Sequence, residues 1–588
     1  MSSLVMNTPL PKHYSCRSPM QRPLAAATTR RRTPVQCTTK FFANPRGAST
    51  LQNYHLEDPN KNNIFKGYSA SEYEEKLEKI RDLVKSRGEE DDPIESLIFV
   101  DTIQRLGMAG HYRKEIDTIM QKHYLRLGDV DFCGYQSSLL KVSLSFRMLR
   151  QRGYHVSADV FNNFKGQDGK FRDELKQDVW GLMELYEATH LSFEGENILN
   201  EAQHFSSQLL HKYLAENTNS DVVKMRFKHP FHKSIARLNF QRDVRGIGKS
   251  ITTLTELSEM DFLMGKYVHR EELRQLSKWW KDLGLIRELK LARDEPSKWY
   301  TWSMAMLIDD ISLSSQRLHL SKSIAFIYLI DDIFDLYGTL DELTLFTEAV
   351  QKWDYDAMNM LPDYMKLCYK SLLDTTNETG WTICEKHGYN PINSLKQTWA
   401  SLCNAFLVEA KYFASDKLPN ANEYLANGKV SSGVHVVLVH LFFLLGHNAT
   451  NLDDISNLIS SVAAILRLWD DMGTAQDEHQ NGADGSYIQC YMNDQPGISY
   501  QQTREHVAHV IEREWKRLNK ECFNLNNHST GPFQEAALNL ARMVPLMYSY
   551  DDNQQLPVLA EYINLMLLSP ASLEPDRQNK INSFEFSV

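Results

Sequence analysis

From Tyr68 onward, the chain is a succession of segments whose apolar residues recur at helical spacing. In the first of them, Leu77, Ile80 and Val84 fall on one face of a helix. No window of eight residues alternates apolar and polar side chains cleanly enough to predict a strand. Glycine and proline, which mark turns, number only 27 and 19 among 588 residues, so we expect long helices with few connections. The pattern predicts an all-α fold and argues against a β-sandwich or barrel.

The length of the chain, 588 residues, is too great for one compact core. The segment 228–249 is basic and rich in turn-forming residues, and a new helical stretch follows it from Thr253. We therefore expect a domain boundary near this segment. The prediction is a leader over residues 1–50, an N-terminal helical domain over 51–265 and a C-terminal helical domain over 266–588.

The beginning of the chain differs in charge from the rest. Eight Lys or Arg and twelve Ser or Thr precede Glu57, the first acidic residue. A Ser- and Arg-rich start without acids, and without the apolar core of a secretory signal, is typical of an organelle transit peptide. The alternative is a tail with no targeting role. The formal charge of the whole chain is −10, which argues against a nucleic-acid partner because such binding needs a basic face.

The most apolar run of the chain covers residues 434–445 and is interrupted by His435 and His440. A membrane-spanning helix needs about 20 residues, so we expect no membrane span. The preceding Ser431, Ser432 and Gly433 form a combination that can break a helix.

Three aspartates stand at the end of a second apolar run, 324–330. At helical spacing, Asp331 and Asp335 share a face and Asp332 lies beside them. Carboxylates brought together at the end of a core helix repel one another and lose hydration, and a divalent cation relieves both costs. Ligands that are all oxygen point to Mg²⁺. Paired aspartates also occur at 309–310, 453–454 and 551–552, so a solvated helix end is the alternative reading of this motif alone.

A second acidic motif strengthens the metal hypothesis. Asp470, Thr474 and Glu478 follow another apolar helical stretch at steps of four residues, which makes a continuous stripe of oxygen atoms on one helix face. Arg467 stands about one turn earlier, where its guanidinium could bind a phosphate held by the metal. Two such stripes, each at the end of an apolar helix, are suited to facing walls of a helical bundle. Together they predict a site for Mg²⁺ and a diphosphate.

The two motifs resemble the aspartate-rich and NSE/DTE metal motifs of plant class I terpene synthases. The resemblance extends over nearly the whole chain after the leader and includes Phe99–Met108, Phe146–Tyr154, Leu185–His190, His232–Arg237, Trp279–Trp280, Tyr337–Leu343 and Phe442–Gly446. It implies two helical domains: an N-terminal domain like a relic α-barrel and a C-terminal catalytic bundle of the class I terpenoid synthase type. It also implies three Mg²⁺ ions that Mn²⁺ can replace, and a broken helix at Ser431–Gly433 whose carbonyl oxygens face a carbocation. The leader favours a plastid location, where geranyl diphosphate is the expected substrate pool in this family.

Departures from the family pattern narrow the expected reaction. Arg293 matches the first arginine of the family's RxR pair, but Glu295 stands in place of the second, so diphosphate capture is expected to depend more on Arg467. The RRx8W motif of cyclic monoterpene synthases is absent, because Phe41 follows Arg31 and Arg32 where tryptophan is required and Trp180 is the first tryptophan. Its absence resembles the linalool and nerolidol synthases. No DxDD motif of class II cyclases is present.

The expected function is Mg²⁺-dependent ionisation of geranyl diphosphate, with water capture to give linalool, and nerolidol from farnesyl diphosphate. The expected metal ligands are Asp331, Asp332, Asp335, Asp470, Thr474 and Glu478. Asp331, Asp335 and Asp470 would also meet the substrate, with Arg293 and Arg467 on its diphosphate. Trp302, Phe326 and Tyr328 are candidates for the apolar pocket, each with core packing as the alternative. The enzyme is expected to be a monomer.

Three rival functions remain open. Proton loss in place of water capture would make the chain a myrcene or ocimene synthase. An isoprenyl diphosphate synthase would share the bundle and Mg²⁺, although its second motif would be another DDxxD, whereas Thr474 stands in the present one. A non-catalytic helical interaction protein is the third rival, and it gives no reason for two chelating stripes.

Overall fold

The computed structural model describes residues 70–88, 93–129, 138–217, 220–235, 248–308, 310–415, 417–449, 452–478, 485–523, 531–551 and 555–568. The predicted leader, residues 1–50, lies outside them. Within these ranges all regular elements are helices, with a single isolated β-bridge between Lys165 and Phe171 and no strand. The all-α prediction is confirmed.

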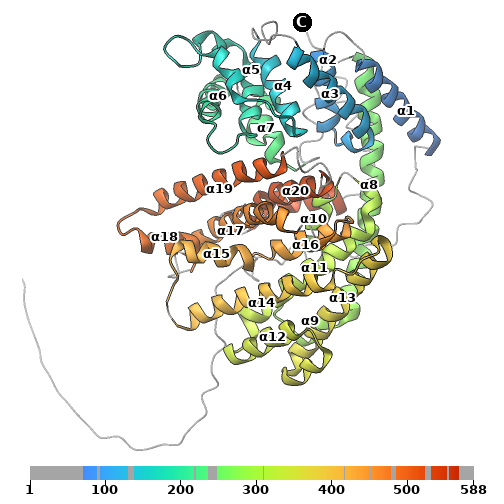
Figure 1. Ribbon diagram of the computed structural model, residues 1–588, viewed down its shortest axis with the longest axis vertical. Coiled ribbons are helices and arrows are strands. Elements are labelled where there is room, and N and C mark those ends of the chain that lie inside the picture. The colour runs from blue at the N-terminus through green and yellow to red at the C-terminus, as the bar shows by residue number, and fades with distance from the viewer. Residues whose placement is uncertain are drawn as a thin grey trace, which may run out of the picture. The chain divides into compact units, whose positions relative to one another are not determined.

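Among the described residues, seven α-helices precede the basic segment, and Figure 1 shows how they are arranged. They are α1 (Ala70–Arg87), α2 (Pro93–Arg105), α3 (Arg113–Asp129), α4 (Leu139–Gln151), α5 (Val179–Thr189), α6 (Asn197–Glu216) and α7 (Asp221–Lys228). Their buried apolar residues form two clusters, one centred on α1 to α3 and one on α4 to α6.

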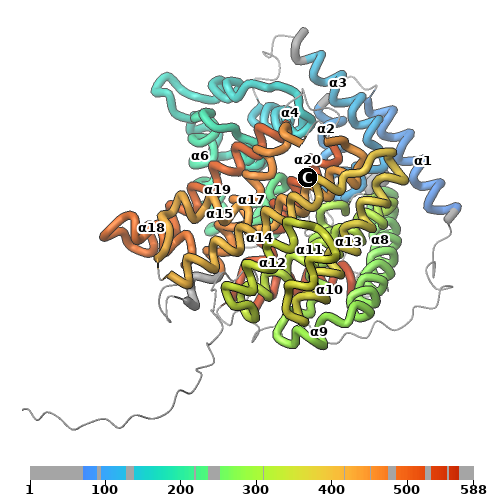
Figure 2. The backbone as a smooth tube through the Cα atoms, turned by 60° about the horizontal axis from the view of Figure 1, so that its bottom comes forward, coloured from blue at the N-terminus to red at the C-terminus, as the bar shows by residue number. Residues whose placement is uncertain are grey.

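The helices that follow the basic segment surround one large apolar cluster. They are α8 (Gly248–Leu283), α9 (Leu285–Glu288), α10 (Pro296–Met306), α11 (Ser314–Asp332), α12 (Leu340–Lys352), α13 (Asp363–His387), α14 (Ile392–Ala414), α15 (Ala421–Ser431), α16 (Val434–Leu444), α17 (Ser456–Glu478), α18 (Tyr487–Asp494), α19 (Tyr500–Cys522), α20 (Gly531–Tyr548) and α21 (Pro557–Ile563). In Figure 2, α12, α13 and α14 lie next to one another, and each packs against the other two.

The most apolar stretch is divided between two of these helices. Among the described residues, Ala421–Leu444 is the one helical stretch with the length and apolarity of a membrane span, and 78% of its apolar window is buried within the protein. Ser432 and Gly433 interrupt it, so it forms α15 and α16 in place of one continuous helix. The predicted helix break at Ser431–Gly433 is present.

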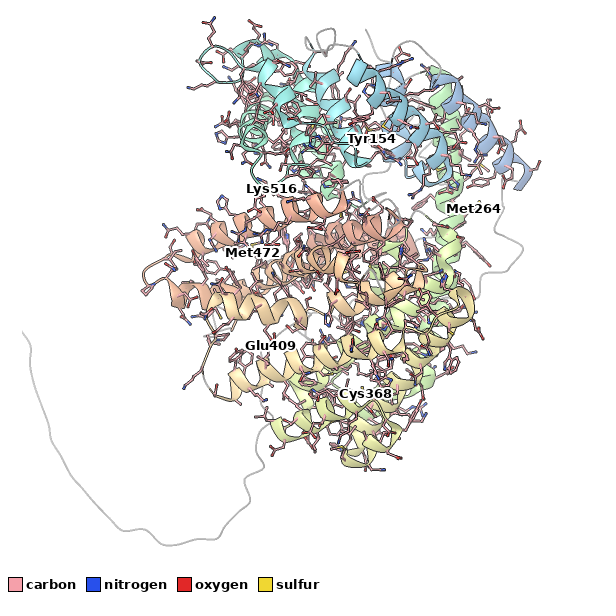
Figure 3. The ribbon with its side chains drawn as sticks, viewed as in Figure 1. Tyr154, Met264, Cys368, Glu409, Met472 and Lys516 are labelled. Carbon is pink, nitrogen blue, oxygen red and sulfur yellow. The ribbon has the colours of Figure 1, made fainter. Side chains whose placement is uncertain are left out.

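Helix α8 contributes to two different cores. Leu254, Leu257 and Met260 in its first half belong to the cluster of α1 to α3, whereas Leu273 in its second half belongs to the large C-terminal cluster. The predicted boundary between residues 265 and 266 falls between these halves, next to Met264 (Figure 3). No loop separates the halves, because α8 is continuous there. The limits of the two domains stay a prediction.

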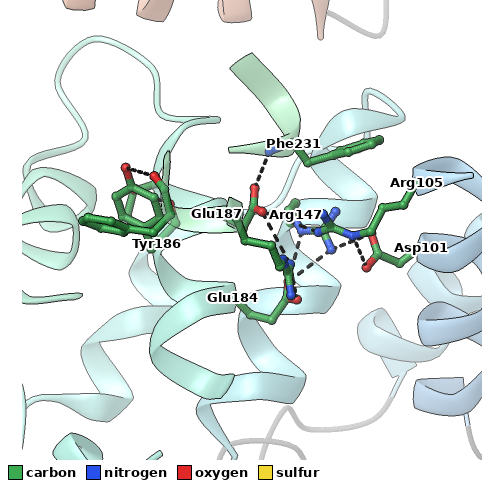
Figure 4. A network of polar contacts seen from close by, with 10 residues as sticks. Asp101, Arg105, Arg147, Glu184, Tyr186, Glu187 and Phe231 are labelled. Carbon is green, nitrogen blue, oxygen red and sulfur yellow. Dashed lines mark hydrogen bonds and ion pairs between the residues drawn. The ribbon is translucent and has the colours of Figure 1, made fainter. Parts of the chain in front are cut away.

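A buried network of charged side chains ties together the N-terminal helices (Figure 4). Arg147 on α4 pairs with Asp101 on α2 (2.8 Å) and with Glu184 on α5 (3.1 Å). Arg226 on α7 pairs with the other oxygen of Glu184 (2.8 Å). Burial raises the pKa of Asp101, but the charges of Arg105 and Arg147 outweigh it and lower that pKa to about 2. These helices are therefore held together by ion pairs in addition to apolar packing.

Candidate active site

Helix α11 places two aspartates in the interior. Its side chains are almost all buried from Leu320 onward, because α8, α10, α13 and α16 pack around it. This accounts for the apolar run 324–330, which has no solvent face to fill with polar residues. Asp331 is 1% exposed and Asp332 is 4% exposed. The alternative of a solvated helix end is therefore wrong for these two carboxylates.

The helix changes its winding directly after Asp332. Residues Ile333–Tyr337 form a single π-helical turn, η9, closed by a bond from the Gly338 N–H to the Ile333 carbonyl (2.9 Å). Asp335 lies in this turn and is buried. Asp331 therefore lies at the end of an α-helix, whereas Asp335 lies in a π turn, which contains more residues than an α turn. That the two aspartates share a face stays a prediction. Turns of this kind are frequent at functional sites.

Arg293 neutralises the two α11 aspartates from the loop between α9 and α10. Its Nη2 lies 2.6 Å from Asp331 Oδ2 and 2.7 Å from Asp332 Oδ1, and its backbone N–H donates to Asp332 Oδ2 (2.8 Å). Burial raises the pKa of Asp331 to about 7 and also raises the pKa of Asp332, although Arg293 opposes both shifts. The same carboxylates raise the pKa of Arg293 despite its burial, so the guanidinium stays charged.

Helix α17 carries the second motif. Arg467 Nη2 donates to Asp470 Oδ2 (2.5 Å) and lies 3.2 Å from Asp471 Oδ1. Asp471 also accepts bonds from the Tyr424 hydroxyl (3.0 Å) and the Tyr487 N–H (3.0 Å), so it connects α15, α17 and α18. These bonds give Asp471 a structural role beside Asp470.

The α17 backbone remains helical as far as Glu478, which keeps positions 470, 474 and 478 on one helix face. The side chains of Thr474 and Glu478 lie outside the described structure.

The two motifs lie close to common neighbours. Both α11 and α17 pack against α16. Tyr548 on α20 is buried, which raises the pKa of its hydroxyl, and the charge of Asp470 and the Tyr328 hydroxyl of α11 raise it further. The Tyr548 carbonyl lies so close to Gly473 that a Cβ there would approach it to 2.5 Å. The glycine of the second motif is therefore required by the packing of α20.

The arrangement fits a divalent cation in its donor chemistry. Asp331 Oδ1 is buried and accepts no hydrogen bond, although the other oxygen of the same carboxylate pairs with Arg293. An ionised oxygen without a partner is costly in the interior and is the ligand type that Mg²⁺ prefers. Among the side chains that the structure describes, no three Asp, Glu, His or Cys groups form a metal site by themselves. The complete ligand set stays a prediction.

The candidate pocket residues separate into two environments. The Trp302 Nε1–H donates to the Tyr328 hydroxyl (3.2 Å), and the Tyr328 ring lies 5.0 Å from the Arg293 guanidinium carbon. Trp302 and Tyr328 thus adjoin the charged groups. Phe326 packs edge to face with Trp279 of α8 at a centroid distance of 6.0 Å, which places it in the contact between α8 and α11. Its role in a pocket stays a prediction.

Two buried residues beside the motifs were not expected from the sequence. Tyr424 and Glu409 are 7% and 5% exposed. Glu409 occupies a position on the apolar face of α14, three residues after the buried Phe406. A lone acid on the apolar face of a helix was the signal that could have identified it.

Comparison with known proteins places this geometry in a family. Residues 50–229 match the terpene synthase N-terminal domain, and residues 281–517 match the metal binding domain of the terpene synthase family. A chloroplastic tricyclene synthase of Antirrhinum majus is 56% identical over 506 residues, which cover 84% of this chain and 87% of the relative. This chain belongs to the plant terpene synthase family.

Other members of the family support the fold and the cofactor. An (E)-nerolidol synthase of Cannabis sativa is 48% identical, over 84% of this chain and 91% of that protein. The crystal structure of isoprene synthase from grey poplar, in complex with three Mg²⁺ ions and dimethylallyl-S-thiolodiphosphate, matches with a TM-score of 0.78 at 33% identity, over 85% of this chain and 97% of that chain. This terpene synthase therefore contains the metal binding domain of its family. The plastid location is confirmed by the chloroplastic relatives.

Proposed function

We propose that this terpene synthase converts geranyl diphosphate into linalool in the plastid, acting as a monomer. The observation that carries the proposal is the buried pairing of an acidic motif with an arginine at two places, Arg293 with Asp331 and Arg467 with Asp470. Buried acids and fixed guanidinium groups together suit a ligand that combines metal ions with a diphosphate.

The arginines supply the fixed positive charge. Arg467 is buried and the Arg293 side chain is 11% exposed. The Tyr424 hydroxyl and nearby carboxylates raise the pKa of Arg467, and Asp332 and Asp331 raise that of Arg293, so both stay charged. Each can bind a diphosphate oxygen as the allylic C–O bond breaks and the leaving group takes the electron pair. When bound, Mg²⁺ ions supply further charge stabilisation to the leaving diphosphate. Three Mg²⁺ ions are proposed, and Mn²⁺ could replace them. The residues that would hold the ions are Asp331, Asp332, Asp335, Asp470, Thr474 and Glu478.

The apolar side of the site shapes the fate of the cation. The paired Trp302 and Tyr328 offer aromatic faces beside the arginine, and such faces stabilise a passing positive charge. Water then forms a C–O bond at the tertiary carbon and releases a proton, which gives linalool. Farnesyl diphosphate would give nerolidol by the same step.

Support for the alcohol product comes from the missing RRx8W tryptophan and from the nerolidol synthase relatives. A second candidate is favoured by the tricyclene synthases at 56% identity, namely ring closure of the same cation before it is quenched. The two candidates share the ionisation step. They differ only in whether water captures the cation or the cation first closes a ring.

In the deciding experiment, the leaderless chain (residues 51–588) is incubated with Mg²⁺ and either geranyl or farnesyl diphosphate. The products are separated by chiral gas chromatography. We expect linalool and nerolidol as the main products, and loss of both when the metal is chelated. Tricyclene as the main product would establish the second candidate. Myrcene or ocimene as the main product would show that the cation loses a proton and does not capture water. Chain elongation with added isopentenyl diphosphate would identify a prenyl diphosphate synthase.

A further inference from the structure

Glu409 is a buried carboxylate that the proposed reaction does not use. It lies on α14, on the side that faces α15 (Figure 3). Its Oε1 accepts a hydrogen bond from the Ser431 hydroxyl (2.6 Å) and another from the Asn427 side-chain amide (3.2 Å). Asn427 and Ser431 are four residues apart and therefore lie on one face of α15, in its last two turns. A single oxygen of Glu409 thus makes two bonds that join the end of α15 to α14, beside a third from the Asn427 amide to the Ala405 carbonyl of α14 (3.1 Å).

The end of α15 touches both helices that carry the metal motifs. A Cβ at Gly428 would lie 2.8 Å from the Arg467 side chain of α17. A Cβ at Gly433, where the chain turns into α16, would lie 2.8 Å from Ile327 of α11. Ile327 stands four residues before Asp331, and Arg467 stands three residues before Asp470. A shift of the α15 end would therefore change its contacts with both motif-bearing helices.

Glu409 is also close to the site electrostatically. Burial raises the pKa of its carboxyl to about 6, the charge of Arg467 opposes this shift, and Glu409 in turn contributes to the raised pKa of Asp331. Its second oxygen, Oε2, is buried and accepts no hydrogen bond. Burying a carboxylate costs desolvation free energy unless its hydrogen bonds offset that cost. The two bonds from α15 to Oε1 offset part of it.

We propose that Glu409 is a positioning residue, which fixes the last turns of α15 and the break at Gly433 against α11 and α17 and thereby determines how the carbocation is quenched. The proposal deepens the proposed function and rests on it for the reaction, although the fastening of α15 can be tested without substrate. Glu409 itself touches neither metal nor substrate in this role.

The test compares Glu409→Ala, Glu409→Gln and Ser431→Ala with the unaltered enzyme. Glutamine keeps an acceptor oxygen for both bonds, whereas alanine removes it. The matched control is Glu514→Ala, which removes a buried acid of α19 that pairs with Arg517 on its own helix (2.9 Å). Two quantities are measured: amide hydrogen exchange of peptides covering residues 425–437 without ligands, and steady-state kinetics with the ratio of alcohol to hydrocarbon products.

For Glu409→Ala we expect exchange over residues 425–437 to rise about tenfold, kcat to fall about tenfold with little change in KM, and the product ratio to change. Ser431→Ala should show the same changes to a smaller extent. Glu409→Gln should stay within about threefold of the unaltered enzyme, and Glu514→Ala should leave the exchange and the product ratio unchanged.

Two results would overturn the proposal: unchanged exchange and product ratio in Glu409→Ala, or a Glu409→Gln variant as impaired as Glu409→Ala. Absence of any turnover in the unaltered enzyme would instead contradict the proposed function, and the exchange measurement would still decide whether Glu409 fastens α15.

Discussion

At the scale of single residues, Arg293 explains how two adjacent buried aspartates coexist. Its guanidinium serves Asp331 and Asp332 together, and its backbone N–H adds a further bond to Asp332. Asp332 has both oxygens engaged in this way, whereas Asp331 keeps one oxygen without a hydrogen bond. Of the two neighbours, Asp331 is therefore the better placed to take a metal ligand's role, and Asp332 the better placed to hold the arginine.

Replacing Asp331 by asparagine tests its assignment as a metal ligand. The substitution keeps the shape and removes the charge, so we expect turnover to fall about a thousandfold while the thermal unfolding midpoint changes little. Product formation at saturating Mg²⁺ and thermal unfolding measure the two effects. Asp453→Asn alters an exposed paired aspartate outside the site and should keep full activity. Turnover of Asp331→Asn within tenfold of the unaltered enzyme would contradict the assignment.

At the scale of elements, the break between α15 and α16 depends on one glycine. Gly433 has φ of +67°, which is the left-handed region that side chains disfavour. It also packs against Ile327 with no room for a Cβ. The break therefore needs glycine for its backbone conformation and for its close approach to α11.

Gly433→Ala should affect both stability and catalysis. The left-handed conformation alone costs about 1–2 kcal/mol for alanine, and the clash with Ile327 must displace either α11 or the break. We expect a lower free energy of unfolding and a fall in kcat, measured by urea denaturation and steady-state kinetics. Gly388→Ala is the matched control, because Gly388 has φ of +80° with nothing within 4 Å of its Cβ position. It should lose stability only, and equal kinetic effects in the two variants would contradict the argument.

Much of the element scale could be predicted from the sequence. Helical spacing predicted the all-α fold. The positions of Asp331 and Asp470 at the ends of apolar stretches predicted a metal and diphosphate site, and the roles of these residues stay a prediction. The π turn that holds Asp335 could not be predicted, because its residues are compatible with an α-helix and only the bond from the Gly338 N–H to the Ile333 carbonyl distinguishes the two windings. Glu409 stands out locally only as an acid on the apolar face of α14, and its partners Asn427 and Ser431 could not be predicted because they lie on another helix.

At the scale of the whole molecule, the N-terminal and C-terminal helices differ in how their apolar cores are divided. The C-terminal helices share one extended apolar core, whereas the N-terminal helices combine two smaller cores with the charged network around Arg147. No sequence pattern foretold this network, because Asp101, Arg147, Glu184 and Arg226 come from four separate helices.

Removing Arg147 should destabilise this network strongly. Arg147→Met leaves Asp101 and Glu184 buried with one fewer positive charge, and breaking a buried ion pair costs about 3–5 kcal/mol. Urea denaturation followed by circular dichroism gives the free energy of unfolding. Lys176→Met removes an exposed ion pair with Asp173 in the same region and should cost less than about 0.5 kcal/mol. Similar costs for the two variants would show that the buried network adds nothing to stability.

The continuous helix α8 also limits how members of this family can be recombined. A chimera joined at residue 248 keeps α8 whole but takes Leu254, Leu257 and Met260 away from the core in which they are buried. These three apolar side chains would then face a foreign partner or water, and exposed apolar surface favours aggregation. A chimera that exchanges the catalytic half must therefore take α1 to α3 from the same protein as α8, so that the buried face of α8 keeps its own partners.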